Sequence, residues 1–292
     1  MAPRDILLIL GVAAVWGANF VAAKWAVAEM SPLLVAGLRY VVVLVPAILF
    51  VRRPAVSIGV LVGYGLFVGA GQFGFLFSAI KFGMPAGLAS LVVQVQAFFS
   101  IGLAMLFLGD RPKPTALAGA LIAFGGIAVI AFGRMEGAAL LPVLLTLLAA
   151  MSWGVANLMA KKAGDIDMLG LVVWSALVPP LPLFLLSLVL DGPDAWPRMV
   201  ANISWLGFGS LLFIGWAATV FGYGAWNVLL KRYPTSTVAP FALLVPVVGL
   251  SASALLLGES VDGFEIAGCV LIFAGLLLNV FGPRLLTRRA VV

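Results

Sequence analysis

The sequence contains no histidine, a single cysteine (Cys269) and few charges, which make up 10% of its 292 residues. One cysteine has no partner within the chain, so an internal disulfide is excluded, and the usual zinc sites lack their ligands. No Asp or Glu falls in the middle of a long apolar run, and without histidine a buried proton relay has few possible members. Proton transfer through buried side chains is therefore disfavoured, although a peripheral carboxylate such as Glu29 could still titrate.

The same shortages argue against an enzyme embedded in a membrane. Hydrolysis or group transfer needs a nucleophile with a general base, or a metal site, and the sequence supplies no such cluster. We therefore predict no catalytic residues, no metal and no cofactor. The net charge of +6 comes from basic residues scattered between apolar runs, and because they form no continuous stripe we predict no nucleic-acid partner.

What the chain has in abundance is apolar sequence. Hydrophobic residues make up 64% of it and its mean hydropathy is +1.21. A transmembrane helix needs about 20 mostly apolar residues, and every backbone polar group in lipid must be satisfied within its own helix. We therefore predict an all-α polytopic membrane protein, with the lipid bilayer as a partner. Its ten predicted spans are residues 6–26, 33–51, 58–80, 85–107, 114–132, 139–160, 168–190, 204–229, 235–257 and 264–283.

The first span raises the question of a signal peptide, because Arg4 precedes it and "AVA" at 26–28 resembles a cleavage site. We expect residues 1–28 to be a retained helix instead, since part of their text recurs in the middle of the chain. "WGANFVAAK" at 16–24 returns as "WGVANLMAKK" at 153–162.

The distribution of Lys and Arg predicts the orientation, because these residues are enriched in cytoplasmic loops. If the N-terminus is cytoplasmic, twelve basic residues lie on that side and five lie outside or near the outer face. The first group is Arg4, Arg52, Arg53, Arg111, Lys113, Lys161, Lys162, Lys231, Arg232, Arg284, Arg288 and Arg289, and the second is Lys24, Arg39, Lys81, Arg134 and Arg198. Both termini are therefore predicted to be cytoplasmic.

The second half of the chain repeats the first. "FLGDRPKPTALAGALIAFGGIAVIAFG" at 107–133 aligns with "LLGESVDGFEIAGCVLIFAGLLLNVFG" at 256–282, an offset of 149 residues. Each half holds five predicted spans, and because five is odd, equivalent helices must cross the membrane in opposite directions. The fold class is thus two inverted five-helix repeats, residues 1–135 and 136–292, which form one membrane unit. Such repeats are typical of transporters that bind substrate between them, although a duplicated scaffold without transport is the alternative.

These paired first helices, the "LGDR" and "LGES" segments and the Gly-rich helices that follow them resemble the EamA-type, ten-helix branch of the drug/metabolite transporter superfamily. The resemblance covers essentially the whole chain. Within that branch the sequence is most similar to bacterial inner-membrane exporters of amino acids, including aromatic amino acids. The resemblance implies a multi-pass protein of the bacterial inner membrane that works by alternating access. Facilitated diffusion or exchange is the simpler mechanism.

Candidate substrate-binding residues are aromatic and amide side chains that share a helical face. Trp16 with Asn19, Gln72 with Phe75, and Trp153 with Asn157 have the spacing of such a face, and Ser90, Gln94 and Phe98 follow each other at intervals of four. Packing between helices is the alternative role for each. The full set is Trp16, Asn19, Gln72, Phe75, Ser90, Gln94, Phe98, Trp153, Asn157, Tyr223 and Trp226.

Two further expectations concern the walls of the cavity. Gln96 points away from Gln94 by about 200° on an ideal helix, so we assign it to packing or to another interface. In the second repeat Ala239 and Leu243 replace Ser90 and Gln94, so the cavity should be polar mainly on its first-repeat wall, and Pro240 and Pro246 are candidates for distorting the ninth span.

Arg39 is the one basic residue clearly inside a predicted span, roughly 10 Å from its outer end at 1.5 Å per residue. We place it in an outer vestibule, where it could receive a substrate carboxylate. Pairing with Glu29 or snorkelling to the surface is the alternative.

Pockets with little fixed charge suit a net-neutral solute, so we predict a small-molecule substrate that is an amino acid or a similar zwitterion. Efflux of hydrophobic drugs or another metabolite, and a receptor or scaffold without flux, are the alternatives. A monomer is compatible with all of these.

Overall fold

The computed structural model describes residues 1–133, 140–164 and 166–289, and this described part of the chain contains helices and no strands. Nine helical segments have the length and composition of membrane spans, and a bent pair of helices makes a tenth. The prediction of an all-α membrane protein with ten spans is therefore confirmed. Seven of the spans are α1 (Pro3–Glu29), α2 (Pro32–Phe50), α7 (Pro114–Gly133), α8 (Leu140–Lys162), α9 with α10 (Met168–Ser175 and Pro180–Leu190), α15 (Leu244–Leu257) with its preceding turns, and α16 (Gly263–Arg289).

The other three spans are the third, fourth and eighth, and each has a π-helix or a 3-10 turn between two α-helices. The third is α3 (Ile58–Tyr64), the π-helix η1 (Gly65–Phe73) and α4 (Gly74–Lys81), and the eighth is α12 (Trp205–Leu212), the π-helix η3 (Phe213–Phe221) and α13 (Gly222–Arg232). The fourth is α5 (Ala86–Val92), the 3-10 turn η2 (Val93–Val95) and α6 (Gln96–Leu108). The ninth begins as α14 (Thr235–Val238) and the 3-10 turn η4 (Ala239–Leu243), which contains Pro240.

These irregular turns occupy matching positions in the two halves of the chain. A π-helix interrupts the third and eighth spans, and a 3-10 turn interrupts the fourth and ninth. The fourth and ninth spans also both end at a glycine in the left-handed conformation, Gly109 with φ 68° and Gly258 with φ 65°. Such a residue closes a helix without the steric cost that a side chain would carry. The repeat is thus visible in the backbone as well as in the sequence.

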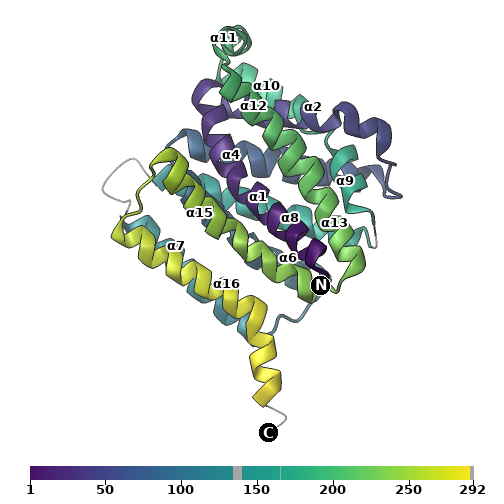
Figure 1. Ribbon diagram of the computed structural model, residues 1–292, viewed down its shortest axis with the longest axis vertical. Coiled ribbons are helices and arrows are strands. Elements are labelled where there is room, and N and C mark those ends of the chain that lie inside the picture. Colours follow the sequence, from purple (N-terminus) through teal and green to yellow (C-terminus); the bar gives the residue numbers. More distant parts are fainter. Residues whose placement is uncertain (134–139, 165, 290–292) are drawn as a thin grey trace.

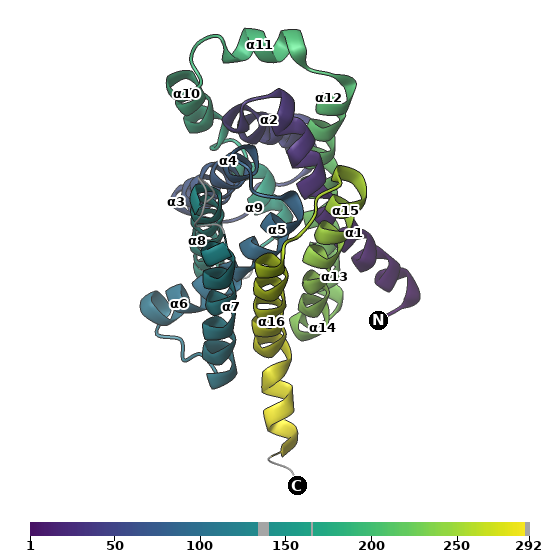
Figure 2. The same ribbon diagram turned by 90° about the vertical axis from the view of Figure 1, so that its left-hand side faces the viewer.

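The last spans of the repeats, α7 and α16, lie side by side at one edge of the molecule (Figures 1 and 2). The two helices approach each other closely because glycines on each helix face the backbone of the other. A Cβ on Gly126 would lie 2.7 Å from the Gly268 carbonyl oxygen, and one on Gly268 would lie 2.6 Å from that of Gly126. Gly119 and Gly275 repeat this arrangement further along the pair. Small residues allow such an approach of helices in lipid.

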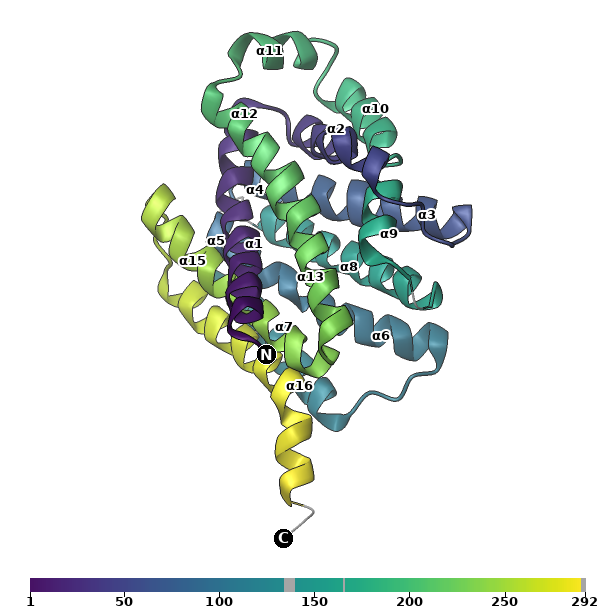
Figure 3. The ribbon, with the colours of Figure 1, turned by 45° about the vertical axis from the view of Figure 1, so that its right-hand side comes forward.

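The first spans of the repeats lie on either side of the centre. In Figure 3, α1 passes between α15 and α13, and it packs against both. In the other half, α8 packs against η1, α4 and α6. We call the end of the bundle where α1 begins and α6 and α8 finish the termini end, and the opposite end the α11 end, after the short helix α11 (Ala195–Asn202) that lies across it (Figures 1 and 2).

Two features of the fold differ from the expectation. The seventh span is not continuous but bends by 40° between α9 and α10, where Pro179 and Pro180 stand. Proline lacks the N–H that would continue the helix, which accounts for the break. The helix α11 was expected to be a connection only. The predicted boundary between repeats, at 135 and 136, and Arg134 lie outside the described residues.

Candidate functional site

A cavity of about 400 Å³ lies between the two repeats. It is lined by side chains from both repeats, and most of them are aromatic or carry an amide. They are Trp16, Asn19, Phe20, Arg39, Tyr64, Gln72, Phe73, Leu76, Val93, Gln94, Gln96, Trp153, Asn157, Met168, Ala218, Tyr223, Trp226, Leu230, Ala242 and Val245.

Three aromatic residues form one wall of this central cavity. The Trp16 ring centroid lies 5.5 Å from that of Tyr223 and 5.2 Å from that of Trp226. The Trp16 indole N–H donates to the Ala218 carbonyl on η3, 2.8 Å away. Because one hydrogen bond and two ring contacts fix the indole, its face is a preformed apolar surface. The sequence-based candidates Trp16, Tyr223 and Trp226 are thus brought together, although they lie more than 200 residues apart along the chain.

The amide side chains differ in how far they are satisfied. Gln94 donates through Nε2 to the Ala242 carbonyl on η4, at 3.3 Å. The Oε1 of Gln72 and the Oδ1 of Asn19 are buried and accept no hydrogen bond. Buried polar groups are normally paired, so these two acceptors stand out as free to bind a donor in the cavity. With Gln96 and Arg39, the polar wall comes mainly from the first repeat, as the repeat comparison predicts.

Arg39 lies in the wall of this central cavity and not in an outer vestibule. Its side chain is 2% exposed, its Cζ is 3.6 Å from the Phe73 ring centroid, and its Nη2 donates to the Thr219 hydroxyl at 2.7 Å. The expected alternative partner, Glu29, accepts instead from the backbone N–H and the hydroxyl of Ser204 at the α11 end, at 2.8 and 2.6 Å. The Nε and Nη1 of Arg39 have no hydrogen-bond partner.

Three candidates from the sequence do not line the cavity. Phe75 is 38% exposed on α4, and its place is taken by Phe73. The spacing that favoured Phe75 assumes an α-helix, but Gln72 and Phe73 end the π-helix η1, whose wider turn changes which residues share a face. Ser90 is fully buried where α5 meets α15, with its hydroxyl donating to the Gly87 carbonyl at 2.6 Å. Phe98 is buried against Phe124.

Gln96 was expected to lie outside the cavity, but it is part of the lining. Its Oε1 accepts from the Nδ2 of Asn157 at 2.7 Å, and the same Nδ2 also lies 3.1 Å from the Ser100 hydroxyl. Gln94 lies in the 3-10 turn η2 and Gln96 begins α6, so the angle between them is not that of an ideal α-helix. No pattern in the sequence marks this turn.

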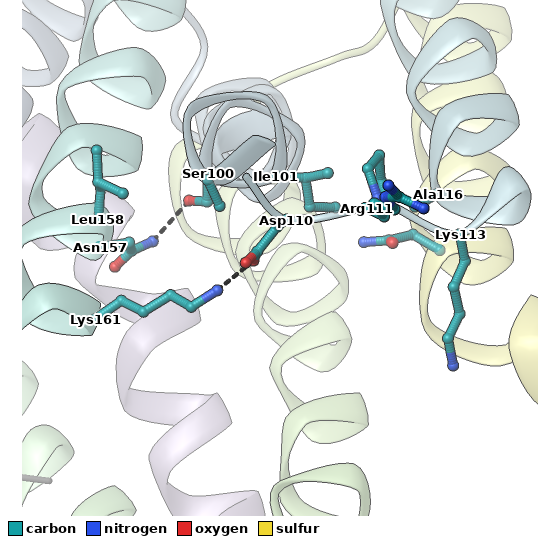
Figure 4. A pocket seen from close by; sticks show the side chains of 12 residues that line it. Ser100, Ile101, Asp110, Arg111, Lys113, Ala116, Asn157, Leu158 and Lys161 are labelled. Carbon is teal, nitrogen blue, oxygen red and sulfur yellow. Dashed lines mark hydrogen bonds and ion pairs between the residues drawn. The ribbon is translucent and has the colours of Figure 1, made fainter. Parts of the chain in front are cut away.

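A second cavity, of about 450 Å³, lies at the termini end (Figure 4). Asn157 lines both cavities, while Ser100 belongs to this one and Gln96 to the central one. Figure 4 shows Asn157 directed at Ser100, and Lys161 reaching Asp110, with which it forms an ion pair. Lys161 and Asp110 are about half exposed, so this cavity is open to water. The hydrogen-bonded group of Asn157, Gln96 and Ser100 therefore stands between an open cavity and the central one.

The lining of the central cavity has the character of a binding site. Arg39 is the one charged side chain that lines it, and the rest of the lining is aromatic, aliphatic or amide. Within the described ranges, no group of three or more Cys, Asp or Glu side chains is placed to hold a metal ion. An apolar cavity with a few convergent polar groups is the usual form of a small-molecule site.

Comparison with known proteins agrees with this geometry. The model of the EamA-like transporter family matches residues 4–132 and again 140–281. A probable amino-acid metabolite efflux pump of Salmonella typhimurium is 48% identical over 290 residues, 97% of either chain. One of the same description from Escherichia coli is 47% identical, also over 97% of either chain. A crystal structure with 20% identity aligns with a TM-score of 0.63 over 98% of this chain and 99% of that one, which shows a shared fold.

Proposed function

Because the chain belongs to the EamA-like transporter family, we propose that it exports amino acids or similar small zwitterions across the bacterial inner membrane by alternating access. The two relatives at 47% and 48% identity are described as probable amino-acid metabolite efflux pumps, which supports this substrate class. Their bacterial origin supports the inner membrane. The predicted excess of Lys and Arg at the termini end supports a cytoplasmic location for that end.

The observation that carries the proposal is the central cavity between the repeats. Its aromatic wall offers apolar contact, and its first-repeat wall offers one guanidinium and several amides. These two walls suit a free amino acid, because it combines an apolar or neutral side chain with one negative and one positive group. The proposed contact residues are the nine sequence-based candidates found in the lining, with Phe73 and Gln96 added: Trp16, Asn19, Arg39, Gln72, Phe73, Gln94, Gln96, Trp153, Asn157, Tyr223 and Trp226.

The second cavity supplies a route from the termini end. Arg111, Lys113 and Lys161 line it with one acidic residue, Asp110, so its electrostatic potential favours the carboxylate of an approaching solute. From there a solute reaches the central cavity by displacing the group formed by Asn157, Gln96 and Ser100. This path runs from the proposed cytoplasmic side toward the substrate site, the direction that export requires.

A flux assay tests the proposal. The purified protein is reconstituted in liposomes, and the movement of labelled amino acids, nucleosides and cationic dyes is followed with and without a pH gradient. We expect amino acids to move down their gradient faster than in protein-free liposomes, with saturation, and without a requirement for the pH gradient. Saturable movement of dyes alone would favour drug efflux, and binding without flux would favour a receptor. Either result would overturn the proposal.

A further inference from the structure

We propose that Arg39 binds the α-carboxylate of the substrate, while the free amide oxygens of Gln72 and Asn19 accept hydrogen bonds from its α-ammonium group. This inference rests on the proposed function and narrows it to substrates that carry both groups on neighbouring atoms, that is, free α-amino acids. The aromatic wall then holds the substrate side chain.

The cost of burying Arg39 is the first argument. A guanidinium that is 2% exposed has lost nearly all of its hydration, and such burial costs several kcal/mol unless a counter-charge compensates it. In the described part of the chain no carboxylate lies within ion-pair distance of Arg39. The contacts given by the structure are the Thr219 hydroxyl, the face of the Phe73 ring and, with its centroid 5.8 Å away, the Tyr40 ring. These contacts orient the guanidinium and leave its charge without a partner.

The direction of the free donors is the second argument. Nη2 is held by Thr219, and the unpartnered atoms are Nε and Nη1. A carboxylate is held bidentately along one edge of a guanidinium, and each such edge pairs Nη2 with either Nε or Nη1. Thr219 uses one N–H of Nη2, so the second N–H of Nη2 and one of the unpartnered donors remain for the two oxygens, and the stacked Phe73 ring keeps them in plane. Because Arg39 lines the cavity, we expect an anion that enters it to bind these donors, which are buried and have no partner in the described part of the chain.

The backbone of the eighth span fixes this arrangement. The Thr219 hydroxyl donates to the Ile214 carbonyl, five residues earlier in the π-helix η3, at 2.9 Å. The hydroxyl hydrogen is thereby used, so the oxygen remains an acceptor for Nη2 of Arg39. Thr219 is 1% exposed and acts on the substrate only through Arg39, so it is a positioning residue.

The two free acceptors distinguish an amino acid from a simple carboxylate. Gln72 immediately precedes Phe73, on whose ring Arg39 lies, and both residues line the central cavity. Asn19 on α1 also lines it, and the side-chain carbonyl oxygens of Gln72 and Asn19 are buried and lack a donor. An ammonium group brings three N–H donors, whereas a carboxylic acid without an amino group would leave both oxygens unpaired. Unpaired buried acceptors penalise such a ligand.

The experiment compares three competitors in liposomes that transport a labelled amino acid. These are the same amino acid unlabelled, the amine that lacks its carboxylate, and the acid that lacks its amino group. For the wild type we expect only the amino acid to compete strongly. In Arg39→Gln we expect KM for the amino acid to rise by about tenfold or more, and its advantage over the amine to disappear, because a charge-assisted hydrogen bond is lost.

Gln72→Met tests the other half of the recognition, since it removes the acceptor at similar volume and leaves Arg39 in place. We expect its preference for the amino acid over the deaminated acid to fall, with little change in the preference over the amine. Arg39→Lys, which keeps the charge, should retain part of the carboxylate preference. The matched control is Arg198→Gln on α11, whose guanidinium is exposed and bonds the Asp191 and Asp194 carbonyls.

The outcomes separate this inference from the proposed function. Wild-type flux of amino acids with unchanged KM and competitor selectivity in Arg39→Gln would overturn the inference and leave the function intact. Absence of any amino-acid flux in the wild type would overturn the function itself. If Arg39→Gln fails to fold, Arg39→Lys and Gln72→Met with wild-type selectivity would still contradict the inference.

Discussion

Several side chains of the cavity are held by atoms on the irregular turns of the opposite repeat. Trp16 donates to the Ala218 carbonyl and Arg39 to the Thr219 hydroxyl, both on the π-helix η3. Gln94 donates to the Ala242 carbonyl on the 3-10 turn η4. Such turns depart from the regular i to i−4 hydrogen-bond pattern, so their backbone groups are accessible to side chains. Each of these bonds joins the two repeats.

Gln94 and Asn19 allow a direct test of the cavity wall. We predict that Gln94→Ala and Asn19→Ala each lower the rate of amino-acid flux by several-fold with little change in the amount of folded protein. Both side chains line the cavity; Asn19→Ala removes an oxygen that has no hydrogen-bond partner, and Gln94→Ala removes one bond, that to the Ala242 carbonyl. The measurement is initial flux in liposomes at equal protein content, judged by size-exclusion chromatography.

Phe75 provides the matched control for these two variants. It satisfies the sequence-based spacing with Gln72, but it is 38% exposed on the outer side of α4. We expect Phe75→Ala to transport at the wild-type rate. Wild-type rates in both amide variants, or a loss in Phe75→Ala alone, would show that the substrate does not use this cavity.

The sequence predicts the cavity residues where helices are regular and misses them where they are not. Trp16, Asn19 and Asn157 lie where an ideal helical spacing places them, on α1 and α8. The choice of Phe75 over Phe73 failed because η1 is a π-helix. Arg39 was placed too far out because a distance along one helix gives no information on which neighbouring helices enclose it.

At the level of helices, the close packing of α7 against α16 depends on glycines, which have no side chain. Gly126 and Gly268 each point at the carbonyl of the other, and they align by the repeat offset with Gly275 and Gly119, which do the same. In lipid the association of helices relies on close packing, because tails and side chains are equally apolar. A methyl group at these positions would meet backbone, which has no rotamer with which to move away.

Neighbouring glycines on α7 make this testable. We predict that Gly126→Ala destabilises the protein by about 1–3 kcal/mol, the usual range for overpacking. The added Cβ would lie 2.7 Å from the Gly268 oxygen and 2.9 Å from the Leu271 Cβ. The measurement is the apparent melting temperature in detergent, followed by the loss of soluble monodisperse protein.

Gly125→Ala is the control, since a Cβ there meets nothing within 4 Å. It should melt at or slightly above the wild-type temperature, because alanine favours a helix over glycine by about 1 kcal/mol. Equal melting of the two variants would contradict the close packing of α7 and α16.

The number of spans could be predicted from the sequence because hydropathy and charge report directly on lipid exposure. The breaks within spans could not, because a π-helix or a 3-10 turn is selected by the contacts around it. Gly69 illustrates this, since a side chain there would overlap Pro179 at the bend between α9 and α10. The sequence shows that a glycine is present, but it does not show that the residue packed against it lies in a different helix.

At the level of the whole molecule, corresponding segments of the two repeats make different contacts at the two ends of the bundle. At the α11 end the Glu259 carboxylate accepts from the backbone N–H groups of Ala86 and Gly87, at 2.8 and 3.1 Å, and α5 packs onto α15 at Leu250 and Ser253. The counterparts of Glu259, Leu250 and Ser253 by the repeat offset are Asp110, Ile101 and Ala104, which line the open cavity at the termini end. The surface that is packed against α5 at the α11 end thus corresponds, in the other repeat, to a surface that lines an open cavity at the termini end.

This asymmetry predicts that Glu259 stabilises the closed α11 end. A carboxylate at the start of a helix contributes about 0.5–2 kcal/mol, so its neutralisation should shift the population toward opening at that end. In a Cys269→Ala background, Ala104→Cys should react with a water-soluble maleimide because Ala104 lines the open cavity, and Ser253→Cys should be protected because Ser253 packs against Gly87 of α5. We expect Glu259→Gln to raise the Ser253→Cys reaction rate several-fold and to lower that of Ala104→Cys.

The repeat counterpart of Glu259 provides the control for this experiment. The side of the membrane from which the cysteines are labelled reports the orientation of the protein. Asp110→Asn removes the corresponding carboxylate at the open end, where it contacts Lys161 and not a helix start, so it should leave Ser253→Cys protected. Ala104→Cys should label in inside-out vesicles and not in intact cells, because the termini end is proposed to be cytoplasmic. Equal labelling of Ser253→Cys in the presence and absence of Glu259 would show that this carboxylate does not hold the α11 end closed. Labelling of Ala104→Cys from the outside would reverse the orientation, and with it the direction in which the second cavity admits substrate.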